Sequence, residues 1–243
     1  MASIVISEED GVRYLHFGSE WVQGAMRIAR PWSLELQYTR EMMLPLLLRT
    51  QAAWPASVLM IGLGSASHTR FLHRHRPRAR LTVVEIDPAV VAAARQFFKL
   101  PEESPRLRIE IGDGHEFVAL KPGRFDLILV DGFDEKGRTG MLDTLPFYLH
   151  CSQRLTDRGL VAVNLVDRSR GVGASIERLH LAFDARVLVL PRCEEANTVV
   201  IAAAGRPVRR SREELLSAAG ELRDATALDL GPLVESLESG VVL

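Results

Sequence analysis

Two acidic residues follow an apolar run near the middle of the 243-residue chain. Asp131 and Asp134 stand three positions apart in the segment 129–134, LVDGFD, at the predicted end of a strand. Two neighbouring carboxylates raise each other's proton affinity unless a cation lies between them. An amine substrate is such a cation, and a carboxylate can take its proton and free the nitrogen as a nucleophile. The pair predicts proton transfer from an amine; a solvated acidic loop is the alternative.

A glycine-rich turn and another acid precede this pair along the chain. Gly62 and Gly64 stand in the segment 62–67, GLGSAS, where they allow a sharp turn and a close approach to a ligand. A plain turn between a strand and a helix is the alternative, because Ser67 replaces the third glycine of a dinucleotide-binding motif. Glu85 lies 21 residues after Gly64, where nucleotide-binding folds place the acid that binds ribose hydroxyls. These residues together predict a nucleoside site.

A third acid, Asp113, ends the strand that follows Glu85 in the sequence. Its carboxylate can accept a hydrogen bond from the exocyclic amine of adenine, and Gly114 leaves room for a flat purine. The alternative is that Asp113 caps the next helix, because aspartate is a preferred residue at that position. Both interpretations place Asp113 and Gly114 at the same end of the predicted sheet as Glu85 and Asp131.

The elements that position these residues alternate between apolar strands and helices from residue 57 onward. Near-continuous runs of Val, Ile and Leu predict strands that are buried on both faces. Repeated units of this length predict a Rossmann-like, doubly wound α/β fold with a mostly parallel sheet. Ligands of such folds bind at the carboxyl ends of the strands. We expect a small N-terminal β region over residues 1–33, the nucleoside-binding domain over 34–205, and a helical tail over 206–243.

Three helices of this scheme carry more specific expectations. A helix is predicted over residues 34–49, with a kink at Pro45 because proline cannot complete the hydrogen-bonding pattern. The predicted helix over residues 67–75 carries three histidines and two arginines, and Arg76 follows it directly, which favours a solvated helix over a zinc site. The tail helix, over residues 211–223, is predicted to lie on the surface.

Composition limits the classes of partner. The formal net charge is −1, with 47% hydrophobic and 25% charged residues, so the chain has no basic character for binding nucleic acid or a membrane surface. No apolar run is long enough to span a bilayer, and the N-terminus does not resemble a signal peptide. Cys151 and Cys193 have no metal-binding spacing, and we expect no metal site. A cytoplasmic location is therefore expected.

The four strand ends together resemble the spermidine synthase (polyamine aminopropyltransferase) family from about residue 12 to residue 203. The family pattern is a glycine-rich loop, Glu-x-Asp, Asp-Gly or Asp-Ala, and Asp-x-x-Asp, which here read GLG (62–64), EID (85–87), DG (113–114) and DGFD (131–134). The resemblance implies transfer of an aminopropyl group from decarboxylated S-adenosylmethionine to a polyamine such as putrescine, with methylthioadenosine as the second product. It also implies a homodimer.

The resemblance assigns a role to each site residue. Asp131 is the expected general base, and Tyr38, Asp134 and Gln23 are expected to bind the amine. The nucleoside is expected to contact the following residues: Gly62, Gly64, Ser65, Glu85, Asp113 and Gly114.

Three departures from the family pattern leave other functions open. Glu135 follows Asp134, where the family usually has a proline. Ser65 stands where the family usually carries an Asp that holds the aminopropyl ammonium, and Thr39 stands where Gln or His is common. A methyltransferase that uses S-adenosylmethionine is one alternative, because Ser65 and the nearby helix amides could accommodate a methionine carboxylate. A nucleoside- or polyamine-binding homologue without catalytic activity is the other.

Overall fold

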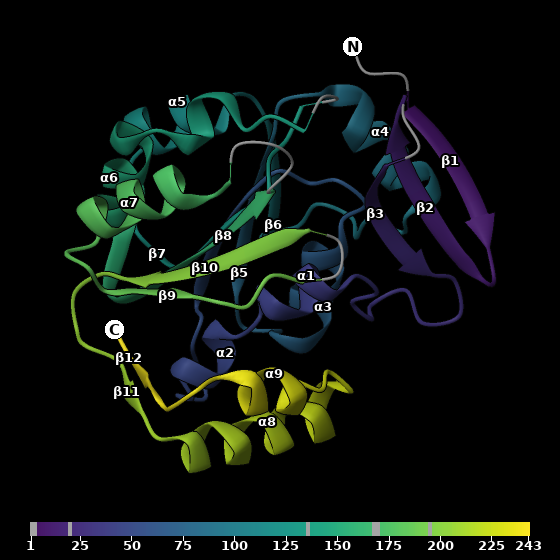
Figure 1. Cartoon of the computed structure of the whole chain (residues 1–243). Coiled ribbons are helices and arrows are strands. Elements are labelled where there is room, and N and C mark those ends of the chain that lie inside the picture. The colour runs from purple at the N-terminus through teal and green to yellow at the C-terminus, as the bar shows by residue number, and fades with distance from the viewer. Residues whose placement is uncertain (1–3, 19–20, 135–136, 167–170, 194–195) are drawn as a thin grey trace.

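A seven-stranded sheet forms the centre of the computed structural model, which describes residues 4–18, 21–134, 137–166, 171–193 and 196–243 (Figure 1). The strand order is β6-β5-β4-β7-β8-β10-β9; the first five strands run parallel, and β10 is antiparallel to both of its neighbours. This confirms the predicted doubly wound, mostly parallel α/β fold. The strands are β4 Ser57–Ile61, β5 Arg80–Glu85, β6 Leu107–Ile111, β7 Phe125–Val130, β8 Leu155–Val166, β9 Val187–Val189 and β10 Asn197–Ala203.

Alternate residues of the central strands pack into two separate layers of the core. In β4, Val58 and Met60 belong to one cluster of buried side chains, and Leu59 and Ile61 belong to the other. This alternation follows from the period of two residues in a strand and explains why the strands are apolar throughout. The second layer is covered by α5 Gly114–Leu120, α6 Leu145–Arg154 and α7 Gly173–Ala182, while the first receives α3 Ser67–His75 and α4 Pro88–Phe97.

A small antiparallel sheet precedes the large one, as predicted, and lies beside α4 in Figure 1. Its strands are β1 Ile4–Glu9, β2 Val12–Phe17 and β3 Val22–Arg27. Leu15 and Met26 are fully buried against Phe98, at the end of α4. The apolar face of this small sheet thus packs it against the end of α4.

The helix predicted over residues 34–49 is instead two short helices, α1 Gln37–Glu41 and α2 Pro45–Leu48. Between them the backbone makes tighter bonds, from Met43 N to Arg40 O at 3.0 Å and from Leu44 N to Glu41 O at 2.9 Å. Pro45 occupies the first turn of α2, where its missing N–H costs no helical bond. The prediction of one kinked helix was therefore wrong, because proline begins a new helix here.

The C-terminal segment packs its apolar side chains on the core. It contains α8 Arg212–Thr226, α9 Gly231–Ser236 and a short ladder of β11 Arg209–Arg210 with β12 Val241–Val242. Leu215, Leu222 and Val234 are buried in the same cluster as the leucines of α2. Most residues of α8 are exposed, so it is a surface helix as predicted. Its apolar stripe packs on α2, a partner that the sequence did not reveal.

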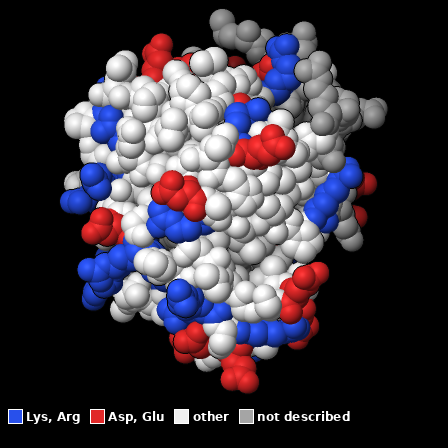
Figure 2. Space-filling model, turned by 60° about the vertical axis from the view of Figure 1, so that its left-hand side comes forward, with Lys and Arg blue, Asp and Glu red and all other residues white. Residues whose placement is uncertain are grey.

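Figure 2 shows one face of the protein, where Lys and Arg side chains are mixed with Asp and Glu around a broad uncharged area. The net charge of −1 therefore reflects interspersed charges on this face. Within the described ranges, no helix has both the length and the apolar character needed to cross a membrane.

Candidate active site

An open cavity of about 920 Å³ lies at the carboxyl ends of the central strands. Its wall includes Glu85 from β5, Asp113 after β6, Asp131 after β7 and Asn164 on β8, together with Gln23 from β3. Strand order reverses direction around β4, which is the position where doubly wound sheets bind ligands. The structure thus brings the acids predicted at three strand ends into one cavity large enough for a nucleoside and a second small molecule.

The glycine-rich turn after β4 forms the floor beneath these acids. Gly62 has a φ of +92°, and a Cβ atom at this position would overlap the carbonyl oxygen of Asp131. Its N–H bonds to the carbonyl oxygen of Val84 at 2.9 Å. Gly64 has a φ of +50° and lines the cavity as well. Glycine at residue 62 is therefore required both for the backbone conformation and for the contact with the strand end that carries Asp131.

Glu85 holds the turn from the side of β5. Its Oε2 accepts a hydrogen bond from the backbone N–H of Leu63 at 2.8 Å, and its Oε1 accepts one from Asp87 at 3.0 Å. The side chain is buried, and burial raises the pKa of Glu85, while these backbone bonds lower it. Each carboxylate oxygen retains a second acceptor position, so Glu85 can shape the turn and still accept from a ligand hydroxyl.

Asp113 caps α5, as the alternative interpretation of this residue proposed. Its Oδ1 accepts from the backbone N–H groups of His115 at 2.7 Å and Glu116 at 3.4 Å. In the described part of the chain Oδ2 has no hydrogen-bond partner, and the residue lines the cavity. The space beside Gly114 is filled by the side chain of Ile61, so this glycine allows α5 to pack closely on β4. Capping and ligand binding by Asp113 are compatible, because they use different oxygens.

Asp131 is a half-buried acid in the wall of the cavity, directly after β7. Asn164 donates a hydrogen bond to its Oδ1 at 2.8 Å, and Tyr38 forms a second side-chain hydrogen bond to the carboxylate. Burial raises the pKa of Asp131, whereas nearby His68 and the bonds from Asn164 and Tyr38 lower it. The result is a carboxylate that is held in one orientation and whose pKa lies above its ordinary value. An oriented carboxylate with a raised pKa is suited to act as a general base.

Asn164 and Asn197 are site residues that the sequence analysis missed. Asn164 is 2% exposed, and its Oδ1 accepts a hydrogen bond from Nδ2 of Asn197 at 2.8 Å. Both side chains border the cavity, from the antiparallel pair of β8 and β10. The available signal was a polar residue in each of two strands that are otherwise apolar, VAVNLV and NTVVIAA.

The predicted partner of Asp131, Asp134, carries a basic side chain of its own. Oδ2 of Asp134 lies 2.7 Å from both Nε and a terminal nitrogen of Arg138, and Oδ1 accepts from the backbone N–H of Arg138 at 2.9 Å. Both residues line the cavity. Asp131 and Asp134 are therefore not a pair of carboxylates without a cation, because Arg138 already forms an ion pair with Asp134.

Ser65 faces away from the open cavity. Its hydroxyl lies 3.0 Å from that of Ser67 and 3.4 Å from the carbonyl oxygen of Ala25 on β3. Gly24 leaves the space that this side chain fills. Ser65 instead borders a second, smaller cavity, which shares Gln23, Tyr38 and Asp131 with the large one. Tyr38 and Gln23 thus lie at the predicted site, and Ser65 contributes packing on its outer side.

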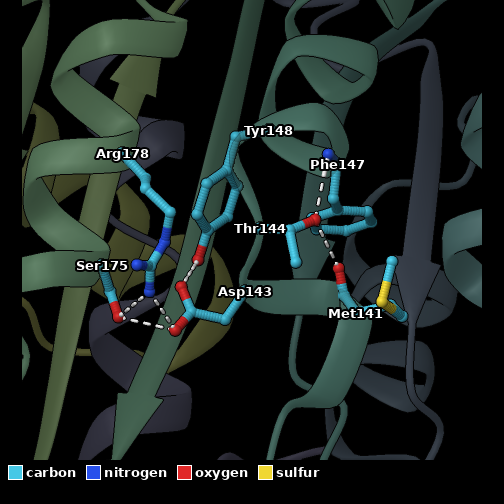
Figure 3. A network of polar contacts seen from close by, with 7 residues as sticks. All are labelled: Met141, Asp143, Thr144, Phe147, Tyr148, Ser175 and Arg178. Atoms are coloured by element: carbon cyan, nitrogen blue, oxygen red, sulfur yellow. Dashed lines mark hydrogen bonds and ion pairs between the residues drawn. The ribbon is translucent and has the colours of Figure 1, made fainter.

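A polar network joins the helical turn before α6 to α6 and α7 (Figure 3). Asp143 ends the helical turn η1 Gly140–Asp143 and accepts from Tyr148 and Ser175, each at 2.8 Å. Arg178 of α7 forms an ion pair with the same carboxylate at 2.7 Å. Thr144 caps α6 and bonds back to the carbonyl oxygen of Met141 at 3.0 Å. The cavity wall at Met141 is thereby tied to two helices of the buried layer.

The helix α3 differs from its prediction as a solvated element. His68 and Arg70 are buried, and only its second half, from His73 onward, reaches solvent. Within the ranges that the structure describes, no group of three or more His, Cys, Asp or Glu side chains could hold a metal ion.

Comparison with known proteins was made for the whole chain. The family model described as the spermine/spermidine synthase domain matches residues 36–165. A polyamine aminopropyltransferase of Chromobacterium violaceum is 37% identical over 238 residues, which cover 98% of this chain and 90% of that protein.

Two solved structures share the fold. One is described as a probable spermidine synthase from Corynebacterium glutamicum, with a TM-score of 0.74, 19% identity, and coverage of 93% of this chain and 91% of that one. The other is human methyltransferase-like protein 13 in complex with SAH, with a TM-score of 0.70, 24% identity, and coverage of 79% and 93%. At these sequence identities the two structures establish only the fold. The chemistry has to be inferred from the residues of the site.

Proposed function

The chain belongs to the spermine/spermidine synthase family, and on this premise we propose that it is an aminopropyltransferase. It transfers the aminopropyl group of decarboxylated S-adenosylmethionine to a polyamine such as putrescine and releases methylthioadenosine. The observation that carries this proposal is the buried, oriented carboxylate of Asp131 in the wall of a cavity of about 920 Å³. An amine needs such a base to become a nucleophile.

The nucleoside half of the cavity is formed by the turn after β4 and the acids that follow β5 and β6. Glu85 is proposed to accept hydrogen bonds from the ribose hydroxyls with the lone pairs that Leu63 and Asp87 leave unused. Oδ2 of Asp113 is proposed to accept from the adenine amine. Gly62 and Gly64 bring the backbone close to the sulfonium end of the ligand.

The reaction balances with one proton released. Asp131 takes a proton from the ammonium of the acceptor, and the freed nitrogen attacks the aminopropyl carbon that is bonded to sulfur. The new C–N bond forms as the C–S bond breaks, and the electron pair of the broken bond stays on sulfur as a neutral thioether. Because burial raises the pKa of Asp131, the carboxylate accepts this proton more readily than an exposed aspartate would.

The acceptor is proposed to lie between Tyr38, Gln23 and Asp134. Tyr38 bonds to Asp131 and borders the cavity, so it can orient both the base and the amine. Asp134 can attract the distal ammonium of a diamine only in exchange for Arg138. An exposed ion pair of this kind contributes about 0.2–1 kcal/mol, so the exchange is accessible to a polyamine.

Methyl transfer from S-adenosylmethionine is the second candidate, and Ser65 is the observation that favours it. Serine has no carboxylate that could bind the aminopropyl ammonium. The hydroxyl of Ser65 forms its contacts within the protein. A site without that carboxylate repels the methionine carboxylate less strongly. It therefore discriminates less well between decarboxylated S-adenosylmethionine and S-adenosylmethionine.

Calorimetric titration with decarboxylated S-adenosylmethionine and with S-adenosylmethionine separates the candidates. Tighter binding of the decarboxylated form, with methylthioadenosine released upon addition of putrescine, is the expected result. Preference for S-adenosylmethionine, with methylated product from an acceptor screen, would replace the proposal with methyl transfer. Binding of either nucleoside without any product would identify a non-catalytic homologue.

Assembly and location follow the same proposal. The protein is proposed to be a cytoplasmic homodimer in which the small N-terminal sheet supplies part of the contact. The buried thiols of Cys151 and Cys193 are compatible with a reducing compartment. Sedimentation velocity tests the assembly: a particle with the mass of two chains is expected, and a monomer at micromolar concentration would contradict it.

A further inference from the structure

A small polar cavity lies next to Asp131 and is distinct from the open one. Its volume is about 20 Å³, which suits a single water molecule. Gln23, Tyr38 and Asp131 border both cavities, so these three side chains separate the water-sized space from the substrate space. The remaining side chains of its wall are mostly polar: Thr39, Ser65, Ser67, His68 and Thr69.

His68 is the titratable group on the protein side of this small cavity. It lies in the first turn of α3, is 8% exposed, and its Nε2 lies 3.2 Å from the carbonyl oxygen of Thr39. A carbonyl oxygen can only accept, so Nε2 carries the hydrogen and Nδ1 is the nitrogen that can take up a proton. Nδ1 is therefore the one ring nitrogen of His68 that is open to a further proton.

The charges that face His68 determine its affinity for a proton. Burial lowers the pKa of His68; Asp131 and the bond to Thr39 raise it, and Arg70, a buried cation of the same helix, lowers it. Tyr38 borders the same cavity and bonds to Asp131. A proton on His68 is thus favoured only while Asp131 is a carboxylate, so the two residues form a pair that exchanges one proton.

We propose that His68 and Asp131 share the proton released by the reaction through one water molecule in the small cavity. This step rests on the proposed function. Asp131 first receives the proton from the acceptor amine and then gives it to the water, which passes one of its own protons to Nδ1 of His68. The outcome is a carboxylate and an imidazolium, with the water unchanged. His68 acts through Asp131 and is a positioning residue that restores the base without opening the substrate cavity.

Replacement of His68 by Gln tests the proposal by kinetics. Gln can still donate to Thr39 but cannot become a cation, so Asp131 loses a group that lowers its pKa. The acid limb of kcat/KM should move about one pH unit upward. At neutral pH, kcat should fall about tenfold while KM for the amine is unchanged. His73→Gln, on the exposed half of the same helix, is the matched control and should leave the pH profile unchanged.

A reduced rate with an unshifted pH profile would show that His68 only supports the packing of α3 and would overturn the proposal. Circular dichroism and thermal unfolding establish that the His68→Gln protein is folded before the profiles are compared.

NMR titration of the imidazoles tests the same pair without any substrate or turnover. In the wild-type protein His68 should titrate, and Asp131→Asn should lower its pKa by about one unit, because the nearby negative charge is lost. A His68 imidazole that stays neutral throughout, or one whose pKa is unaffected by Asp131→Asn, would overturn the inference. Failure of the aminopropyltransferase assay with an intact NMR linkage would instead reject the proposed function alone.

Discussion

Asn164 donates a hydrogen bond of 2.8 Å to Oδ1 of Asp131, and this bond joins β8 to the strand end that carries the proposed base. The side-chain amide of Asn164 cannot flip, because Asn197 donates a hydrogen bond to its Oδ1 at 2.8 Å. Nδ2 of Asn164 therefore faces Asp131. A donor to the charged form lowers the pKa of Asp131, against the effect of burial. Two asparagines thus limit how far the pKa of the buried acid rises.

Asn164→Ala should raise the pKa of Asp131 further, because the carboxylate loses its donor. A hydrogen bond to a charged group contributes about 1.5–3 kcal/mol, which corresponds to about one to two pH units. The acid limb of the kcat/KM profile should shift to higher pH by this amount, and activity at neutral pH should fall accordingly. Asn197→Ala should shift it in the same direction by less, since it affects only the orientation of Asn164. Equal profiles for all three proteins would show that the bond does not control the base.

Asp131→Asn should abolish transfer and leave nucleoside binding intact. Asn keeps the size of the side chain and can still accept from Asn164, but it cannot take up the proton of the amine. Turnover should fall at least a hundredfold, in the range for loss of a general base. Binding of methylthioadenosine, measured by calorimetry, should stay within about twofold of wild type. Full turnover by this variant would show that another group is the base.

The same substitution should change how stability depends on pH. The raised pKa of Asp131 means that the native state holds this proton more tightly than the unfolded chain. The free energy of unfolding is therefore greatest below the ordinary carboxyl pKa and falls as pH rises through the native value. The loss is about 1.4 kcal/mol for each unit of difference between the two pKa values. Asp131→Asn should escape this loss, so its stability in urea should exceed that of wild type at pH 8 and approach it near pH 4.

Glu85→Gln should weaken the nucleoside rather than the chemical step. Removing the charge from the ribose acceptor should reduce affinity for methylthioadenosine about tenfold to a hundredfold. Asp87→Asn is the matched control, because Asp87 lies two residues further on and caps α4 through Ala89 at 2.8 Å. It should leave binding unchanged. If both variants lost affinity equally, the shape of the loop after β5 would be responsible and not the Glu85 carboxylate.

Arg138→Gln should improve binding of a polyamine, since it removes the cation that competes with an ammonium for Asp134. The expected decrease in KM for putrescine is about twofold to fivefold, in line with the small free energy of an exposed ion pair. The dependence of KM on salt should become steeper as the pocket gains net negative charge. Asp134→Asn should change KM in the opposite direction. An unchanged KM in both variants would place the acceptor away from this loop.

Asp143→Asn should destabilise the protein without touching the cavity directly. Arg178 would lose its ion-pair partner, and Tyr148 and Ser175 would lose an ionised acceptor (Figure 3). The free energy of unfolding in urea should fall by about 2–3 kcal/mol. Hydrogen exchange of the amides of η1 should accelerate. Tyr148→Phe, which removes only one of these bonds, should cost about 1 kcal/mol.

The sequence by itself determined the sheet and the order of its acidic strand ends. Runs of β-branched residues separated by helical segments specify parallel strands, and carboxyl ends of parallel strands meet at one edge of the sheet. Glu85, Asp113 and Asp131 could therefore be placed in one site from their spacing alone. The family motifs are also local in the chain, which is why residues 36–165 match the family model.

Only the tertiary structure decided what surrounds each of these acids. The pairing of β8 with β10 brings Asn197 to Asn164, and the packing of α3 brings His68 to Asp131; neither relation has a signature in sequence spacing. Whether Ser65 would face the ligand or β3 depended on the space beside Gly24. Sequence fixes which groups reach a strand end, because that follows from local periodicity. Their partners and pKa values depend on burial and on contacts between distant segments, which exist only after folding.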